Sequence, residues 1–381
     1  MLVSFELHIT QTIMTQPFSH LNHYRLLGNS GLRVSPLCLG AMTFGADWGW
    51  GADAEESRRL LDTYIDRGGN FIDTANIYTN GSSERFLGEF LQGRRDRVVL
   101  STKYSLNTDP TNPNAGGNHR RSLTRAVEDS LKRLDTDYID LYWLHAWDYR
   151  NSIDEVLRAL DDLVRQGKIL YIGLSDTPSW VVAEGQEIAK LRGWTPISAI
   201  QIHYNLVERT SEADMLPMAW HHGITPMPWS PLAGGILSGK YSRDDLQDLS
   251  TEKDGSGRKG VTQAIGQLSE RNLVIVDVVK QIASEIGRSP SQVSLNWLLQ
   301  QPSRPLPIIG ARKLSQLEDN LGALDFTIDA THLAQLNEVS QSPLPFPHNF
   351  ITLDMYRGFV DGQNIIESGF NVYGYQHPSS P

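Results

Sequence analysis

The sequence predicts a (β/α)8 barrel of the TIM-barrel type. Strand-like apolar runs alternate with segments in which apolar residues have helical spacing, along most of the chain. The runs are short and continuously apolar, which is typical of parallel strands that are buried on both faces. The chain has 381 residues, a length that barrels of this class commonly use as one domain.

The first half of the chain contains four strand–helix units. The strands are expected at 36–40, 70–75, 97–103 and 138–145, and the helices at 54–68, 82–93, 121–137 and 152–168. Leu123, Val127 and Leu134 fall on one face of the third helix, which predicts that this face packs on the sheet. Ser152 is a typical N-cap residue for the fourth helix, and Gly167 is typical of its end.

The second half continues the alternation with one interruption. Strands are expected at 169–175, 197–204, 224–230 and 305–310, and helices at about 178–192, 211–223, 270–286 and 290–300, with a last one from about Ser315. The interruption is the segment 242–269, which is polar, rich in glycine and long for a barrel loop. Loops of this length in compact domains are often lids or binding loops.

The two ends of the chain differ from the barrel pattern. We expect residues 1–22 to be a disordered N-terminal extension, 23–341 to form the barrel, and 342–381 to be an irregular tail. The tail either packs over one end of the barrel or stays mobile. Met14 is an alternative start of translation, and the first residues do not have the pattern of a secretory signal.

Composition and charge exclude several classes of protein. The formal net charge is −10, which argues against a broad nucleic-acid surface. We expect no insertion of this chain into a membrane, since no apolar stretch is long enough to span a bilayer. The single cysteine, Cys38, lies in an apolar run and is expected in the core; without a second cysteine there is no intrachain disulfide, which fits a reducing, cytoplasmic location.

Polar side chains stand at the ends of three successive strands. Asp73 ends the second strand, Lys103 the third and His145 the fourth, while Tyr78 follows Asp73 in a loop. Each residue alone has an ordinary structural explanation, as a turn former, a solvated charge or a hydrogen-bonded histidine. In a barrel, however, the carboxyl ends of the strands line one face, so all four side chains are expected to meet there.

These residue types suit the reduction of a carbonyl group. A tyrosine hydroxyl has a pKa near 10 and is a weak acid, and a nearby ammonium lowers that pKa by favouring the phenolate. We therefore expect Asp73 to hold Lys103, Lys103 to tune Tyr78, and His145 to donate to the substrate oxygen. No spacing of cysteine and histidine indicates a metal site.

Seven segments, in this order, resemble successive motifs of the aldo-keto reductase family. They are FIDTANIYTNGSSE, STKYS, SLKRLDTDYIDLYWLH, YIGLSD, QIHYNLVER, PWSPLAGGILSGKY and IIGARKLSQLEDNL. The resemblance covers roughly residues 24–325. Through WSPLAGGILSGKY the chain is most similar to the branch that holds the beta subunits of voltage-gated potassium channels and their bacterial and plant reductase relatives.

The resemblance implies an NADPH-dependent reductase of aldehydes or ketones, with Asp73, Tyr78, Lys103 and His145 as the catalytic residues. It also implies that the long loop covers part of the bound cofactor. The residues expected to bind NADP(H) are Ala41, Met42, Asp73, Ser175, Gln201, Trp229, Ser230, Pro231, Leu232, Ala233, Gly234, Lys240, Gly310, Arg312, Gln316, Asp319 and Asn320. Among them Arg312 is the expected partner of a 2′-phosphate, because a guanidinium pairs phosphate with two hydrogen bonds. Arg258 is a looser candidate for the phosphates.

The substrate end is less clear in the sequence. Besides Tyr78 and His145, aromatic residues fall on loops at strand ends and are expected to bind a small carbonyl compound with an apolar body: Phe44, Trp48, Trp50, Tyr104 and Trp147. Ordinary loop packing is the alternative. A second candidate function is an NADPH-binding regulatory subunit of a membrane-protein partner, similar to the channel subunits. The family resemblance also allows a homo-oligomer.

Overall fold

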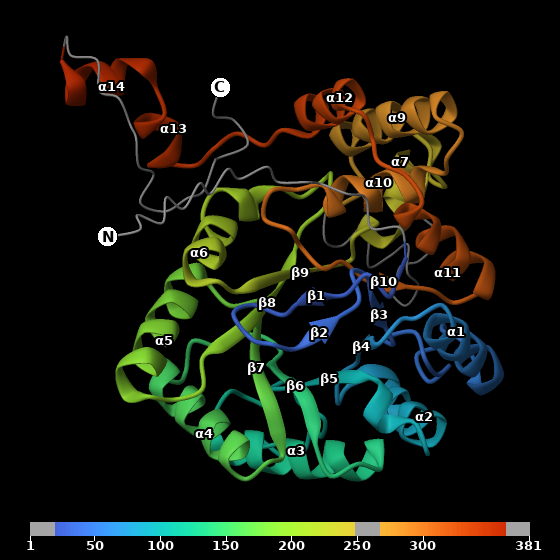
Figure 1. Cartoon of the computed structure of the whole chain (residues 1–381), viewed down its shortest axis with the longest axis vertical. Helices are drawn as coiled ribbons and strands as arrows, with labels where there is room; N and C mark the ends of the chain where they lie inside the picture. Colours follow the sequence, from blue (N-terminus) through green and yellow to red (C-terminus); the bar gives the residue numbers. More distant parts are fainter. Residues whose placement is uncertain (1–19, 248–266, 363–381) are drawn as a thin grey trace, which may run out of the picture.

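The computed structural model describes residues 20–247 and 267–362. Eight parallel strands form a nearly closed barrel in the order β10-β3-β4-β5-β6-β7-β8-β9 (Figure 1). The strands are β3 (Cys38–Gly40), β4 (Phe71–Asp73), β5 (Val99–Tyr104), β6 (Ile139–Leu144), β7 (Ile169–Ser175), β8 (Ile197–His203), β9 (Thr225–Trp229) and β10 (Ile308–Gly310). The predicted fold class is therefore confirmed.

Helices surround the barrel on its outer side (Figure 1). They are α1 (Ala54–Asp66), α2 (Ser82–Phe90), α3 (Arg120–Leu134), α4 (Ile153–Arg165), α5 (Ser179–Arg192), α6 (Met215–His222), α9 (Glu270–Glu285), α10 (Pro290–Leu299), α11 (Leu314–Leu321) and α12 (Ala330–Ser340). Caps fix several starts: Ser152 accepts from the backbone N–H of Glu155, and Ser289 and Gln292 form a reciprocal capping box on α10. Except for α12, these helices match the predicted ones, and most end a few residues earlier.

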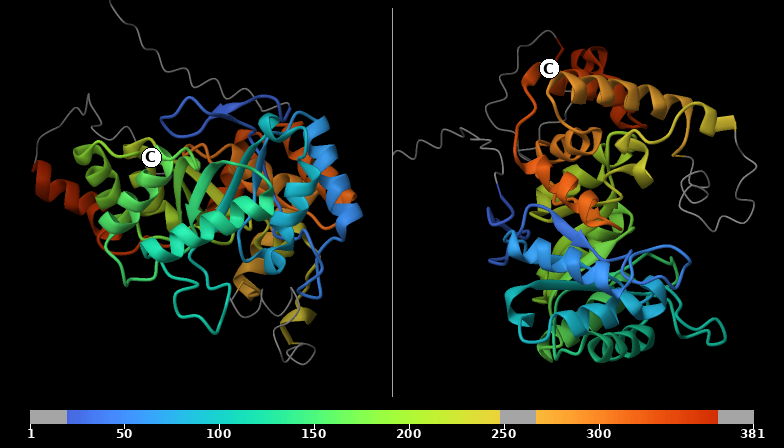
Figure 2. Two further views of the ribbon diagram at one scale, coloured as in Figure 1. Left: turned by 90° about the horizontal axis from the view of Figure 1, so that it is seen from below. Right: turned by 90° about the vertical axis from the view of Figure 1, so that its right-hand side faces the viewer.

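The barrel interior is filled by side chains. Leu141 and Trp143 of β6 and Met227 of β9 pack there with Leu27 and with Cys38 of β3, whose thiol is fully buried. The expectation that Cys38 is a core residue is thus confirmed. The β1–β2 hairpin (Arg25–Leu26 and Arg33–Val34), which the sequence did not predict, supplies Leu27 and lies at one end of the barrel, opposite the α7 segment (Asp244–Gln247) (Figure 2).

The barrel has a seam between β9 and β10, the two ends of the strand order. Leu306 donates its backbone N–H to the carbonyl of Pro226 across this seam, at 2.9 Å. A residue in a strand directs its N–H and carbonyl to the same side, so the prolines at 226 and 228 place missing donors toward β10. The seam therefore follows from the alternating prolines of β9.

The C-terminal region differs from the expected irregular tail. After α12, two short helices follow, α13 (His348–Ile351) and α14 (Asp354–Asp361), and both lie outside the ring of barrel helices (Figure 1). Most of the segments 1–22 and 242–269, and the end of the tail, lie outside the described residues, as does Arg258. In the part of the chain that is described, no helix combines the length and the apolar character needed to cross a bilayer.

Candidate active site

The four residues predicted at the strand ends lie together at the carboxyl end of the barrel. Asp73 is the last residue of β4, Lys103 lies one residue before the end of β5, and His145 directly follows β6. Tyr78 begins the short 3-10 segment η1 (Tyr78–Gly81) that leads into α2. Because neighbouring parallel strands end at the same edge, the sequence placed these side chains correctly relative to one another.

Lys103 is the centre of this cluster and has no exposed surface. Its ammonium donates to Asp73 Oδ2, to the carbonyl of Thr74 at 2.8 Å and to the hydroxyl of Tyr78 at 3.2 Å. Asp73 Oδ1 accepts from Ser101 at 2.7 Å and from Gln201 at 3.3 Å. The buried charge pair is therefore fully hydrogen-bonded, as an ion pair in the interior has to be.

The pKa directions differ in part from the sequence-based expectation. Burial raises the pKa of Tyr78 above its usual value, and Lys103 opposes this shift without outweighing it. Burial is the largest influence on the pKa of Lys103 and acts to lower it, but the charges and hydrogen bonds of Asp73 and Tyr78 together outweigh burial, so that pKa is raised. At neutral pH the site thus holds an ammonium beside a protonated phenol, and not beside a phenolate.

His145 faces Tyr78 across the site. The two rings meet edge to face, with centroids 5.8 Å apart and planes at 84°. Burial and the nearby Lys103 charge lower the pKa of His145 to about 3. Its Nδ1 atom is buried and has no hydrogen-bond partner among the described residues. The imidazole is therefore neutral and has hydrogen-bonding capacity that the protein does not use.

Two buried polar residues lie beside this cluster on the next strands. Ser175 ends β7 and pairs in register with Gln201 of β8. Trp229 ends β9, and its indole N–H donates to Asp176 Oδ1 at 2.9 Å. Ala41 is buried after β3 and Met42 is 38 % exposed. Together with the four residues of the cluster, these residues lie at or near the carboxyl ends of the strands from β3 to β9.

The turn after β9 has an unusual backbone. Ser230, Ala233 and Gly234 all have positive φ, and the Ser230 hydroxyl accepts from Gly234 N–H at 3.0 Å. Pro231 and Leu232 lie within this turn, which leads into the 3-10 segment η4 (Ala233–Ser238). Lys240 follows with its ammonium 4.6 Å from the ring centroid of Tyr241. Backbone held in this region is common where a chain approaches a ligand closely.

The segment after β10 contains the remaining predicted residues. Arg312 donates its backbone N–H to the side chain of Gln316 at 2.9 Å, and Asn320 donates to the carbonyl of Gly310 at 3.4 Å. The guanidinium Nε of Arg312 is buried without a partner among the described residues. Asp319 differs from the others, because its two carboxylate oxygens accept from Ser289 and Gln292 at the start of α10.

The predicted substrate residues divide into two groups. Trp48 contacts Tyr78 edge to face at 6.3 Å, and Trp50 contacts Trp48 at 5.6 Å. Trp147 is half-buried after β6. By contrast, Phe44 has no exposed surface, and Tyr104 is equally buried, stacked on Tyr142. Phe44 and Tyr104 are therefore core residues in this structure, and the aromatic contact with Tyr78 comes from the Trp48 loop.

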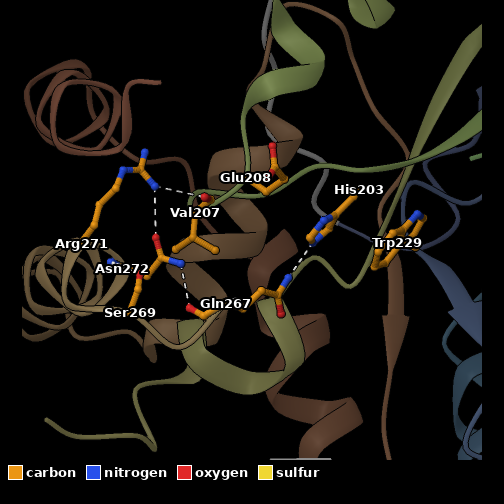
Figure 3. A pocket seen from close by; sticks show the side chains of 8 residues that line it. All are labelled: His203, Val207, Glu208, Trp229, Gln267, Ser269, Arg271 and Asn272. Carbon is orange, nitrogen blue, oxygen red and sulfur yellow. Dashed lines mark hydrogen bonds between the residues drawn. The ribbon is translucent and has the colours of Figure 1, made fainter. Parts of the chain in front are cut away.

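Sequence reasoning missed His203 and Gln267. Both line a pocket of about 470 Å³ together with Trp229, Glu208 and Arg271 (Figure 3). His203 is two residues after Gln201 on β8 and thus on the same side of the strand, which was the available signal. Gln267 has no comparable signal in the sequence, because it lies near the end of the long polar segment and not on a predicted strand. Within 20–247 and 267–362, no group of three His, Cys, Asp or Glu side chains is arranged to hold a metal ion.

Comparison with known proteins agrees with this geometry. The profile described as "Aldo/keto reductase family" matches residues 36–341. An aryl-alcohol dehydrogenase [NADP(+)] from Phanerodontia chrysosporium is 38% identical over 92% of this chain and 92% of its own length. A norsolorinic acid reductase from Aspergillus flavus is 36% identical over 88% of this chain and 86% of its own. A putative aryl-alcohol dehydrogenase from Saccharomyces cerevisiae is 35% identical over 89% and 92%.

Proposed function

The chain belongs to the aldo/keto reductase family, and on that premise we propose that it reduces aryl aldehydes or ketones to alcohols with NADPH. The observation that carries the proposal is the buried Lys103, which contacts both Asp73 and Tyr78 opposite a neutral His145. This arrangement places the hydroxyl proton of Tyr78 and the hydrogen-bonding imidazole of His145 next to each other, where both can reach one substrate oxygen. It contains no nucleophile that is activated for covalent catalysis.

The residues of the chain have separate roles in the proposed reaction. Tyr78, which is protonated at neutral pH, donates its hydroxyl proton to the carbonyl oxygen as charge develops there. Lys103 stabilises the phenolate that remains, and it is already oriented by Asp73 and by the carbonyl of Thr74. Neutral His145 donates a hydrogen bond to the same substrate oxygen. NADPH, when bound, supplies the hydride to the carbonyl carbon.

The described residues fit a nicotinamide dinucleotide phosphate in three places. Ser175 and Gln201 are suited to hydrogen-bond a carboxamide, and the half-buried Trp229 is suited to stack on a flat ring. The left-handed turn at Ser230–Gly234 allows a close approach of pyrophosphate. Arg312, whose Nε has no hydrogen-bond partner within the described part of the chain, suits a 2′-phosphate. The name of the Phanerodontia relative, which includes NADP(+), supports the same cofactor.

The proposed substrate class is a carbonyl compound with an aromatic body. Trp48 places its indole ring beside Tyr78, and Trp50 packs on Trp48. Aromatic side chains in such a cluster favour aromatic ligands. Two of the relatives are named as aryl-alcohol dehydrogenases, and the norsolorinic acid reductase is named for a reduction. The alternative, an NADPH-binding regulatory subunit of a membrane-protein partner, came from the resemblance of WSPLAGGILSGKY to the channel-subunit branch. The relatives found are aryl-alcohol dehydrogenases and norsolorinic acid reductases and not specifically members of that branch, so their names support the enzyme.

The test is the consumption of NADPH with a panel of aromatic and aliphatic aldehydes, for the natural chain and for Tyr78→Phe. The variant is expected to lose about 10²- to 10⁴-fold in kcat, because it lacks the proton donor, while NADPH binding is retained. Tyr24→Phe is the matched control, since its hydroxyl donates to Gly68 away from the cluster. Tight NADPH binding without turnover of any aldehyde would favour the regulatory subunit.

A further inference from the structure

The indole of Trp229 is fixed by a stack that the family resemblance did not imply. His203 and Trp229 are paired in register on β8 and β9. Their rings lie almost parallel, at 8°, with centroids 4.2 Å apart. The imidazole therefore covers one face of the indole. The indole edge is held as well, by the hydrogen bond from its N–H to Asp176.

His203 is itself held in place from two directions. Its Nε2 lies 2.7 Å from the amide nitrogen of Gln267 (Figure 3). The amide nitrogen of Asn205 lies 3.3 Å from the same Nε2. Burial lowers the pKa of His203, so the ring is neutral. An unprotonated Nε2 has one lone pair, which the two amide donors share, and the shorter contact is the one with Gln267. Asn205 also donates to the carbonyl of Ser230 at 3.0 Å. The ring is thus tied both to the start of α9 and to the turn after β9.

The pocket beside the two stacked rings shows why the Trp229 indole needs the support of the His203 imidazole. The pocket of about 470 Å³ adjoins both rings. Without the imidazole, the indole would have room to rotate toward that space, and a ligand that stacks on it would first have to fix its side-chain torsions. Loss of such preorganisation weakens binding even when no direct contact with the ligand is removed.

We propose that His203 is a positioning residue: its stack with Trp229, anchored by Gln267, orients the indole so that the opposite indole face receives the nicotinamide ring. The inference rests on the proposed function, because it assigns a further determinant of the same cofactor site. His203 does not enter the chemistry, so its effect belongs to cofactor affinity rather than to proton transfer.

The experiment measures NADPH affinity by isothermal titration calorimetry for the natural chain and three variants. His203→Ala removes the stack and is expected to raise Kd about fivefold, whereas His203→Phe restores a flat ring and should stay within about twofold. Gln267→Met removes the anchor at similar side-chain size and is expected to raise Kd less than His203→Ala does. At saturating NADPH, kcat should change by less than about twofold in all three.

The outcomes separate the inference from the proposed function. Failure of the natural chain to bind NADPH counts against the proposed function. If the natural chain binds NADPH and His203→Ala binds it equally well or more tightly, the inference alone is overturned, and tighter binding would mean that the imidazole occupies the place of the ligand. Equal weakening by Ala and Phe also overturns it. His221→Ala, on the exposed side of α6, is the matched control.

Discussion

The raised pKa of Tyr78 bears directly on the direction of the proposed reaction. The phenol stays protonated below that pKa, so the proton donor for reduction is fully present at neutral pH and is lost only as the pH rises past it. Oxidation of an alcohol needs the phenolate instead. Because the pKa of His145 is about 3, the imidazole does not titrate near its ordinary value of about 6.5.

We therefore expect kcat for reduction to be flat through neutral pH, and kcat for alcohol oxidation to rise continuously toward alkaline pH. Steady-state rates in both directions across one buffer series, at saturating cofactor, would show this. An inflection near about pH 6.5 in the reductive profile would contradict a neutral, buried His145. The stability of the protein across the same series should be recorded, so that unfolding is not mistaken for titration.

Arg312 is the residue on which the choice between NADPH and NADH depends in our proposal. Arg312→Gln removes the guanidinium and keeps a polar side chain. The expected result is a rise of about tenfold or more in KM for NADPH with little change for NADH, since a charge-assisted bidentate pair to phosphate is lost. Arg288→Gln, a second arginine that packs on Phe326, is the control. Equal effects on the two cofactors would assign the 2′-phosphate to another residue.

For single residues, sequence reasoning predicted the location of a side chain correctly where that location depends only on the residue's position in a strand. Asp73, Lys103 and His145 come together because parallel strands end at one edge. It failed for Phe44 and Tyr104, because whether a loop aromatic turns outward or into the core depends on packing partners such as Tyr142 that lie far away in sequence. The net pKa of Tyr78 was also beyond reach, since burial decides it.

Among the elements, β6 and β7 show how closely the barrel interior is packed. Gly173 of β7 pairs in register with Trp143 of β6, and Trp143 is fully buried. A Cβ atom at Gly173 would lie 2.2 Å from Cε3 of the indole. The pair therefore combines the largest side chain with the smallest, and the indole of Trp143 fills the space that a side chain at Gly173 would need.

Gly173→Ala is accordingly expected to lower the free energy of unfolding by about 2–3 kcal/mol, through overpacking. Urea unfolding followed by tryptophan fluorescence measures this. Gly31→Ala is the matched control, because a Cβ there meets no heavy atom within 4 Å. An unchanged midpoint for Gly173→Ala would mean that the interior can shift to accept a methyl group.

The periodic elements were predictable and the short ones were not. Amphipathic helices such as α3 and α4 carry a repeated pattern over many residues, and β7 was located at its observed bounds. The β1–β2 hairpin has two residues in each strand, too few to show alternation. Its Leu27 is buried against barrel residues that only the folded chain brings near.

In the whole molecule, the C-terminal helices α13 and α14 lie outside the ring of barrel helices. The family match ends at residue 341, and the segment beyond it exposes large apolar side chains, including Phe346 before α13 and Phe359 in α14 at 80% and 71%. Arg271 donates hydrogen bonds to the chain at Ser340, Gln341 and Ser342, which ties the end of α12 to α9.

A chain that ends after Ser342 is expected to keep its Tm within about 2 °C and to keep its reductase activity. Differential scanning calorimetry and the NADPH assay would measure both. Light scattering on both lengths also tests the expected homo-oligomer: a smaller assembly for the short chain would make the exposed apolar side chains the contact. A large loss of Tm would instead show that residues beyond 342 stabilise the barrel.

The seam between β9 and β10 has a consequence for the exchange of amide hydrogens with solvent. The N–H of Leu306 bridges the seam to Pro226, so its exchange rate reports how often the ring of strands opens there. The Trp229–Gly234 turn follows one bordering strand, and the Gly310–Asn320 segment follows the other. A dinucleotide that contacts both segments would connect β9 to β10 at the carboxyl end of the barrel. Deuterium uptake at Leu306 should then slow on addition of NADPH, while uptake at amides between β5 and β6, far from the seam, should not change.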